Sequence, residues 1–130
     1  MAELEQEANF ALTTATELGL PKGAYLACDY EPSNGGRIAN ISQDQASSFV
    51  RRFCEIIESA GYKPIIYGNA KDLVLIGEQT CSAYPVWLAS YTTENPLSPI
   101  EFVAWQYTNC ASIQGIDGEV DVSLFFTPLE

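Results

Sequence analysis

Apolar residues recur at helical spacing in two long stretches of the chain. In residues 2–19 they return every three or four positions and stop before a glycine, and the members are Leu4, Ala8, Ala11, Leu12, Ala15 and Leu18. In residues 43–61 the stripe consists of Ala46, Phe49, Val50, Phe53, Ile56 and Ile57. Ser42 is a typical N-cap for this second stretch, and Gly61 ends it. Both stretches predict amphipathic helices.

Short apolar runs predict strands between and after these helices. Residues 24–30 form a continuous run, which is typical of a strand buried on both faces. The runs at 64–68, 84–91 and 101–108 predict three more strands, and residues 69–77 predict a short helix. "GIDGE", between apolar pairs near the end of the chain, predicts a hairpin turn. This alternation indicates a parallel α/β sheet that becomes all-β at its end, in a single domain covering residues 1–130.

The charge balance narrows the choice of partners. The chain has 6 Lys and Arg against 17 Asp and Glu, a net charge of −11. Such an acidic surface repels phosphate backbones and anionic membranes, so we expect neither nucleic acid nor a membrane as partner. No apolar run approaches the ~18 residues of a membrane span. The acidic N-terminus lacks a signal-peptide pattern, which predicts a protein made in the cytoplasm.

The chain contains no histidine, which excludes Ser-His-Asp and Cys-His catalysis and most zinc sites. Acid–base chemistry near neutral pH must then use carboxylates, Tyr, Cys or Lys. The four cysteines form no C-x-x-C pair, and we expect them to be buried reduced thiols, although their even number leaves disulfides possible.

Two carboxylates close the first predicted strand. Asp29 and Glu31 are two residues apart, so in a strand they share one face, roughly 6.6 Å from each other. The carboxyl end of a parallel strand is where α/β folds carry their active sites. Neighbouring carboxylates raise each other's cost of ionising, so one can stay protonated while the other is charged, as glycosidic hydrolysis requires. A solvated acidic rim before a loop is the alternative interpretation of this pair.

Aromatic residues on the later strands favour a sugar site. "VWLASY" places Trp87 and Tyr91 on one strand, and flat amphipathic rings are surfaces on which sugar rings stack. "AWQYTN" offers Trp105 and Gln106, and "EVDVS" sets Asp121 between valines. Core packing of the rings and a solvated Asp121 are the alternatives.

Four motifs together resemble glycoside hydrolase family 25, the phage and bacterial muramidases called Chalaropsis-type lysozymes. "ACDYE" resembles the family's Asp-x-Glu strand end, and "KPIIYGN" its Pro-x-Ile-Tyr strand. "YPVWLASY" is similar to its Trp-Leu/Ile-Ala-x-Tyr strand, and "FVAWQYTNCASIQGIDGEVDVSLF" to its closing segment. The resemblance runs in order across nearly the whole chain.

The resemblance implies a peptidoglycan-degrading endolysin that cuts the β-1,4 bond between N-acetylmuramic acid and N-acetylglucosamine. It implies Glu31 as proton donor, with Asp29 and Asp121 assisting at the cleft. It implies no metal or other cofactor, a glycan strand of the bacterial cell wall as partner, and action on that wall after release. The residues that would line the sugar subsites are Tyr67, Trp87, Tyr91 and Gln106.

The family's opening Asp-Val-Ser strand and its Tyr-His-Phe strand have no counterpart in the sequence. The expected fold is therefore an incomplete, irregular β/α (TIM-like) barrel that lacks its first strands and ends in a β-hairpin. In such a barrel the strand at 24–30 becomes a sheet edge, which predicts a possible homodimer through that open edge. A truncated, non-catalytic remnant that binds glycan or acts as an assembly partner is the alternative function.

Overall fold

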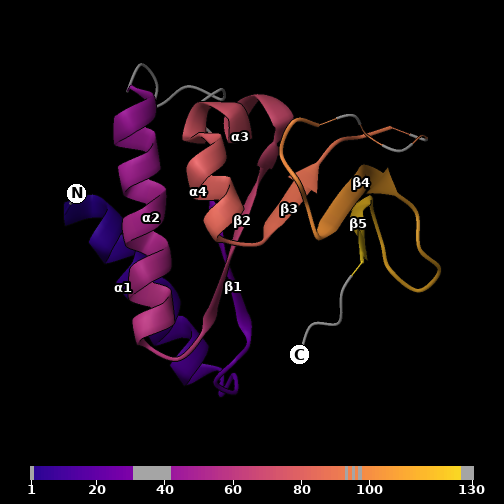
Figure 1. Ribbon diagram of the computed structural model, residues 1–130. Helices are drawn as coiled ribbons and strands as arrows, with labels where there is room; N and C mark the ends of the chain where they lie inside the picture. Colours follow the sequence, from indigo (N-terminus) through magenta and orange to yellow (C-terminus); the bar gives the residue numbers. More distant parts are fainter. Residues whose placement is uncertain (1, 31–41, 93, 95, 97, 127–130) are drawn as a thin grey trace.

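The computed structural model describes residues 2–30, 42–92, 94, 96 and 98–126. Four helices and five strands follow one another along this part of the chain (Figure 1). The helices are α1 (Ala2–Glu17), α2 (Gln43–Ser59), α3 (Ala70–Ile76) and α4 (Glu78–Ala83). The strands are β1 (Tyr25–Asp29), β2 (Lys63–Asn69), β3 (Val86–Ala89), β4 (Ala104–Ala111) and β5 (Val120–Phe125).

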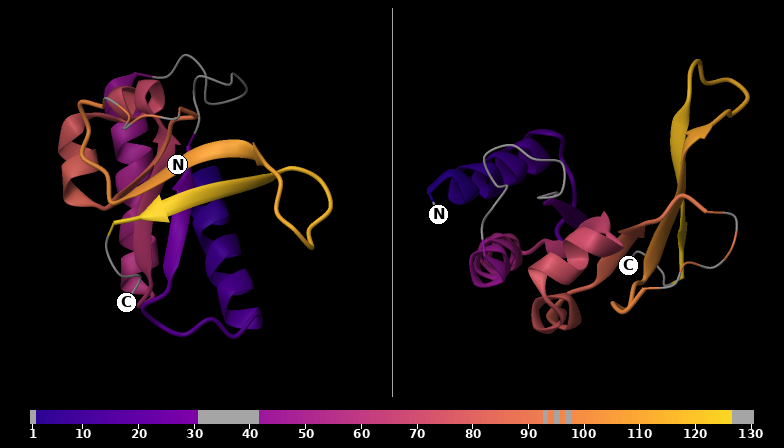
Figure 2. Two further views of the ribbon diagram at one scale, coloured as in Figure 1. Left: turned by 90° about the vertical axis from the view of Figure 1, so that its right-hand side faces the viewer. Right: turned by 90° about the horizontal axis from the view of Figure 1, so that it is seen from above.

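The described strands form one sheet in the order of the sequence, β1-β2-β3-β4-β5. The first four strands are parallel, and β5 returns antiparallel to β4. The sheet is curled, and the long β4–β5 hairpin is turned strongly away from β1 and β2 (Figure 2). The predicted fold class, an incomplete β/α barrel with a closing hairpin, is confirmed.

The helices pack on one face of the sheet, because the strands and helices present matching apolar sides. Ser42 caps α2 in a capping box with Gln45, which fixes where that helix begins. The buried residues of α2 are Ala46, Val50, Phe53, Cys54 and Ile57. They belong to one apolar core with the strand residues Cys28, Ile66, Val86 and Leu88. The opposite side of the sheet is called the helix-free face below.

Several element boundaries differ from those that the sequence predicts. The strand predicted at 84–91 is confined to β3, and the one predicted at 101–108 begins and ends three residues later, as β4. The six residues of α4 show no helical period, so the sequence did not predict this helix. "GIDGE" lies in the loop of a hairpin, as predicted, but the paired strands are β4 and β5.

The prediction that the first strand is buried on both faces is wrong. Cys28 and the following Tyr30 are buried against the helices, whereas Ala27 and Asp29 on the other face are exposed. The reason is the position of β1 at the edge of the curled sheet, where its one strand neighbour among the described residues is β2. This arrangement agrees with the predicted edge strand, and pairing with a second copy stays a prediction.

Candidate functional site

The strand register determines which of the sequence-predicted residues share a face. Asp29 pairs with Tyr67, Tyr67 with Trp87, and Ala89 with Gln106. Register partners in a sheet point to the same side, and side chains alternate along each strand. Because Cys28, Ile66 and Leu88 of the same strands point into the helical core, Asp29, Tyr67, Trp87 and Gln106 all lie on the helix-free face.

Asp29 is the last residue of β1, so its carboxyl stands at the carboxyl end of the parallel strands. The surrounding protein partly desolvates this carboxyl, and the nearby carboxylate of Asp72 opposes its negative charge. Both effects raise the pKa of Asp29 above its ordinary value. Asp29 therefore keeps its proton to a higher pH than an ordinary surface aspartate.

Trp87 is the centre of an aromatic cluster on the helix-free face. Its ring meets Tyr67 edge-on with 4.7 Å between the ring centres, and Phe125 lies 6.2 Å away. The indole Nε1 donates a hydrogen bond of 3.1 Å to Oγ of Ser123. This contact joins β3 to β5 across the intervening β4, so the face holds one continuous set of side chains from β2 to β5.

Gln106 lies beside this cluster and is almost completely buried, with 2% of its surface exposed. Its Oε1 accepts a hydrogen bond of 2.5 Å from the Tyr67 hydroxyl and one of 3.2 Å from the Tyr91 hydroxyl. Tyr91 follows β3 in a loop and is 54% exposed. The structure thus brings together the four residues predicted to contact sugar, two of them through a shared amide oxygen.

Asp121 lies on β5, two residues before Ser123, so it projects toward the same face as Ser123. The next residue, Val122, pairs with Thr108 in the later half of β4, beyond Gln106. Asp121 is therefore at the same end of the sheet as Asp29, although the two residues belong to the two opposite edge strands. Its side chain is exposed.

Glu31, the predicted proton donor, lies outside the described residues. The chain reaches it two residues after Asp29, directly beyond the buried Tyr30. The structure therefore describes Asp29 and Asp121 of the predicted acidic residues, and the position of Glu31 rests on the sequence.

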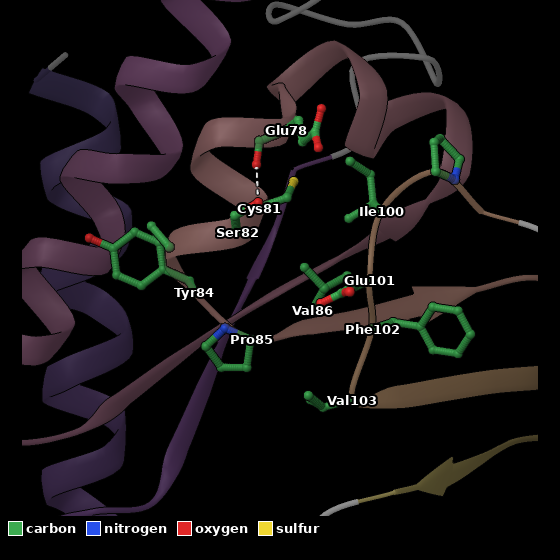
Figure 3. Close-up of a pocket in the computed structure, with 12 residues that line it drawn as sticks. Glu78, Cys81, Ser82, Tyr84, Pro85, Val86, Ile100, Glu101, Phe102 and Val103 are labelled. Carbon is green, nitrogen blue, oxygen red and sulfur yellow. Dashed lines mark hydrogen bonds between the residues drawn. The ribbon is translucent and has the colours of Figure 1, made fainter.

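Two of the hollows in the described part of the chain lie near β3 and β4, at different places. A groove of about 690 Å³ adjoins the site through Tyr91, and it is lined by uncharged residues that include Trp105, Tyr107 and Leu124. A cavity of about 580 Å³ lies between α4 and residues 99–103, beside Val86 at the start of β3 (Figure 3). This cavity is at the opposite end of the parallel strands from Asp29. Trp105 pairs with Leu88 and with Leu124, so this part of the groove lies on the face opposite to Gln106, and the groove meets the candidate site at Tyr91.

The described residues hold no cluster of acidic or thiol side chains that could bind a metal ion. None of the helices in this part of the chain is long and apolar enough to span a membrane. All four cysteines fall within the described residues and are unbonded, and three of them are buried as predicted. The expectation is wrong for Cys110, which is exposed near the end of β4.

Sequence reasoning missed Ser123, Phe125 and Asp72. The first two are placed by the register of β5, and the alternation of "VDVSLF" was the signal that Asp121, Ser123 and Phe125 share a face. Asp72 is fully buried in the first turn of α3, whose N-cap Asn69 accepts a 2.8 Å hydrogen bond from the Asp72 backbone amide. The signal for it was the spacing Asn-x-x-Asp directly after a strand.

Comparison with known proteins identifies the family. A model of "Glycosyl hydrolases family 25" matches residues 1–116. The autolytic lysozyme of Clostridium acetobutylicum is 29% identical over 107 residues, which are 82% of this chain and 32% of that protein. The chain therefore spans about a third of the length of this curated relative.

Solved structures share the fold of this chain. The CTP1L endolysin superposes with a TM-score of 0.70 at 25% identity, covering 95% of this chain and 42% of that one. The catalytic domain of endolysin ply40, from bacteriophage P40 of Listeria monocytogenes, gives 0.68 at 21% identity, with 95% and 60% covered. A family 25 glycosyl hydrolase from Bacillus anthracis gives 0.66 at 20% identity, with 91% and 59% covered. Because the family model matches most of its length, this chain belongs to family 25 of the glycosyl hydrolases.

Proposed function

We propose that this chain carries the peptidoglycan-hydrolysing site of a muramidase of the endolysin type, on the helix-free face of its sheet. The observation that carries the proposal is the convergence of Asp29, Asp121 and the Trp87 cluster on one face at the carboxyl ends of the parallel strands. Membership of family 25 supports the reaction class, and the aromatic rings suit a pyranose ring as ligand.

The proposed reaction cleaves the β-1,4 bond after N-acetylmuramic acid. Glu31 donates a proton to the glycosidic oxygen as the bond to the anomeric carbon breaks, and the sugar beyond it leaves as an alcohol. Positive charge develops at the anomeric carbon, and the carboxyl groups of Asp29 and Asp121 stabilise this centre or orient the neighbouring acetamido group. Water then adds to the anomeric carbon and returns a proton to the site.

The raised pKa of Asp29 fits a shared acid–base role. A carboxyl that is partly desolvated and faces a second negative charge at Asp72 releases its proton at a higher pH than usual. A negatively charged Asp29 then raises the pKa of the adjacent Glu31, which helps Glu31 to remain a proton donor. Removing Asp29 is therefore expected to shift the alkaline limb of the pH profile downward.

A variant pair tests the assignment of the proton donor. Glu31→Gln keeps the shape of the side chain but cannot donate the proton, so release of reducing ends from purified peptidoglycan should fall by about 100-fold or more. Glu101→Gln removes an exposed carboxylate at the cavity of Figure 3, away from the helix-free face, and is the matched control. Equal activity of Glu31→Gln and Glu101→Gln would refute Glu31 as the acid.

A glycan-binding protein without hydrolysis is the second candidate. The edge position of β1 favours this candidate. Among the described residues β1 has a strand neighbour on one side, and its residues Ala27 and Asp29 are exposed. This candidate predicts binding to insoluble peptidoglycan with no reducing ends released. A pull-down with peptidoglycan, run beside the reducing-end assay, separates the two functions.

A further inference from the structure

The hydrogen-bonding capacity of a phenol constrains what the two tyrosines of the site can offer a ligand. Each tyrosine hydroxyl has one proton to donate and lone pairs with which to accept. Tyr67 and Tyr91 both give that proton to Oε1 of Gln106, at 2.5 Å and 3.2 Å. A hydroxyl whose proton is already engaged can meet a further partner only as an acceptor.

Gln106 is placed so that a sugar has little access to it. Its side chain is 2% exposed, between the two phenols and on the same face as Trp87. Tyr91, in contrast, is 54% exposed. A ligand on this part of the face therefore meets the ring and hydroxyl oxygen of Tyr91 before it meets the amide.

We infer that Gln106 is a positioning residue that engages the hydroxyl protons of Tyr67 and Tyr91, so that the exposed Tyr91 oxygen meets a glycan as a hydrogen-bond acceptor. The groups that Tyr91 selects are donors, namely sugar hydroxyls and the acetamido N–H of an N-acetylhexosamine. The inference deepens the proposed function and rests on it for the identity of the ligand. It also replaces direct sugar contact as the expected role of Gln106.

Two substitutions of Gln106 separate this role from the alternatives. Gln106→Glu gives a carboxylate, which accepts both protons and donates none at neutral pH, so it should preserve the arrangement. Gln106→Leu places a side chain of similar size that cannot accept a hydrogen bond, so the hydroxyl groups of both tyrosines should lose this bond and reorient. If the amide nitrogen, and not the oxygen, contacted the phenols, the order of the two variants would be reversed.

The first readout needs no ligand. The ¹³Cζ resonances of Tyr67 and Tyr91 report whether each hydroxyl donates a hydrogen bond. They should move in Gln106→Leu and stay close to the wild-type values in Gln106→Glu, with thermal unfolding as the check that both variants fold. Unchanged resonances in Gln106→Leu would overturn the inference whatever the chain does to peptidoglycan.

The second readout is binding of a soluble tetrasaccharide of alternating N-acetylglucosamine and N-acetylmuramic acid, in a Glu31→Gln background so that the ligand stays intact. Gln106→Leu and Tyr91→Phe should each raise Kd by about 3- to 10-fold, the effect of one neutral hydrogen bond, and Gln106→Glu should leave it within about 3-fold. In a Tyr67→Phe, Tyr91→Phe background, Gln106→Leu should add no further loss.

A further loss in that background would mean that Gln106 touches the glycan directly, which would contradict the inference. Absence of tetrasaccharide binding with wild-type Gln106, despite the expected tyrosine resonances, would instead reject the proposed glycan site. The two failures are therefore distinguishable.

Discussion

The hydrogen bond between Trp87 and Ser123 gives the sharpest test of how the site is assembled. It joins β3 to β5 across β4, and it can form only if Ser123, and with it Asp121, faces the same side as Trp87. Trp87→Phe keeps an aromatic ring but removes the N–H donor, and Ser123→Ala removes the acceptor. A double-mutant cycle of these substitutions isolates the energy of the contact.

The magnitude follows from the geometry. A neutral hydrogen bond of 3.1 Å between partly buried groups contributes about 0.5–1.5 kcal/mol to the free energy of unfolding. With an unfolding entropy of about 2.1 cal/mol/K per residue, a loss of 1 kcal/mol lowers the Tm of a chain of 130 residues by about 4 °C. The free energy of unfolding should fall by at least about 1 kcal/mol in each single variant. In the double variant it should fall by about 1 kcal/mol less than the sum of the two single losses.

Chemical denaturation followed by circular dichroism measures these free energies. Trp105→Phe combined with Ser123→Ala is the matched control, because the Trp105 indole donates to the Ser90 carbonyl at 2.8 Å, and its register partner is Leu124, which faces the side opposite to Ser123. Its coupling energy to Ser123 should be zero within about 0.3 kcal/mol. An equally small coupling between Trp87 and Ser123 would refute the register of β5 and the placement of Asp121 on the helix-free face.

Three further predictions concern stability and reactivity. Asp29→Asn should stabilise the protein at pH 7. Because the pKa of Asp29 is raised in the folded state, Asp29 lowers the free energy of unfolding as the pH rises from about 3.9 through the folded-state pKa. The gain in stability, measured by urea denaturation, should therefore vanish below about pH 3. Leu88→Ala should cost about 3–5 kcal/mol because Leu88 is fully buried at the centre of the sheet, whereas Leu75→Ala, at a side chain 41% exposed, should cost much less in the same assay. Cys110 should be the one thiol that reacts with a disulfide reagent in the native state, because it is exposed. Burial keeps the reagent away from the other three thiols, and it raises the pKa of Cys54 to about 12. Equal reactivity of all four thiols without denaturant would contradict the described core.

Local patterns in the sequence were enough to predict most of the fold. The stripe of α2, with Ser42 before it and Gly61 after it, gave the correct helix because capping and periodicity act within a few residues. The parallel sheet was also predicted correctly, since alternating helices and strands favour it. The short α4 was missed because tertiary contacts hold it: its buried Thr80 is joined by hydrogen bonds to Ser47 and Arg51 of α2.

The candidate site was predictable in its members but not in its contacts. Spacing placed Asp29 at a strand end, the pattern of "VWLASY" gave Trp87 and Tyr91, and the family resemblance supplied Tyr67. The burial of Gln106 and the contact of Trp87 with Ser123 depend on strand register, which is set between residues far apart in the chain. The irregular pairing of β4 around Tyr107 shifts this register again, and no local signal marks it. The exposure of Ala27 follows from the edge position of β1, which an apolar run alone does not reveal.

The identity of the new reducing sugar tests the central claim most directly. Purified peptidoglycan is incubated with the chain, the soluble fragments are reduced with borohydride, and the terminal sugar alcohol is identified by mass spectrometry. A muramidase site on the helix-free face predicts muramitol, formed from N-acetylmuramic acid, and its loss in Glu31→Gln. A terminal glucosaminitol, or muramitol released equally by wild type and Glu31→Gln, would contradict the account.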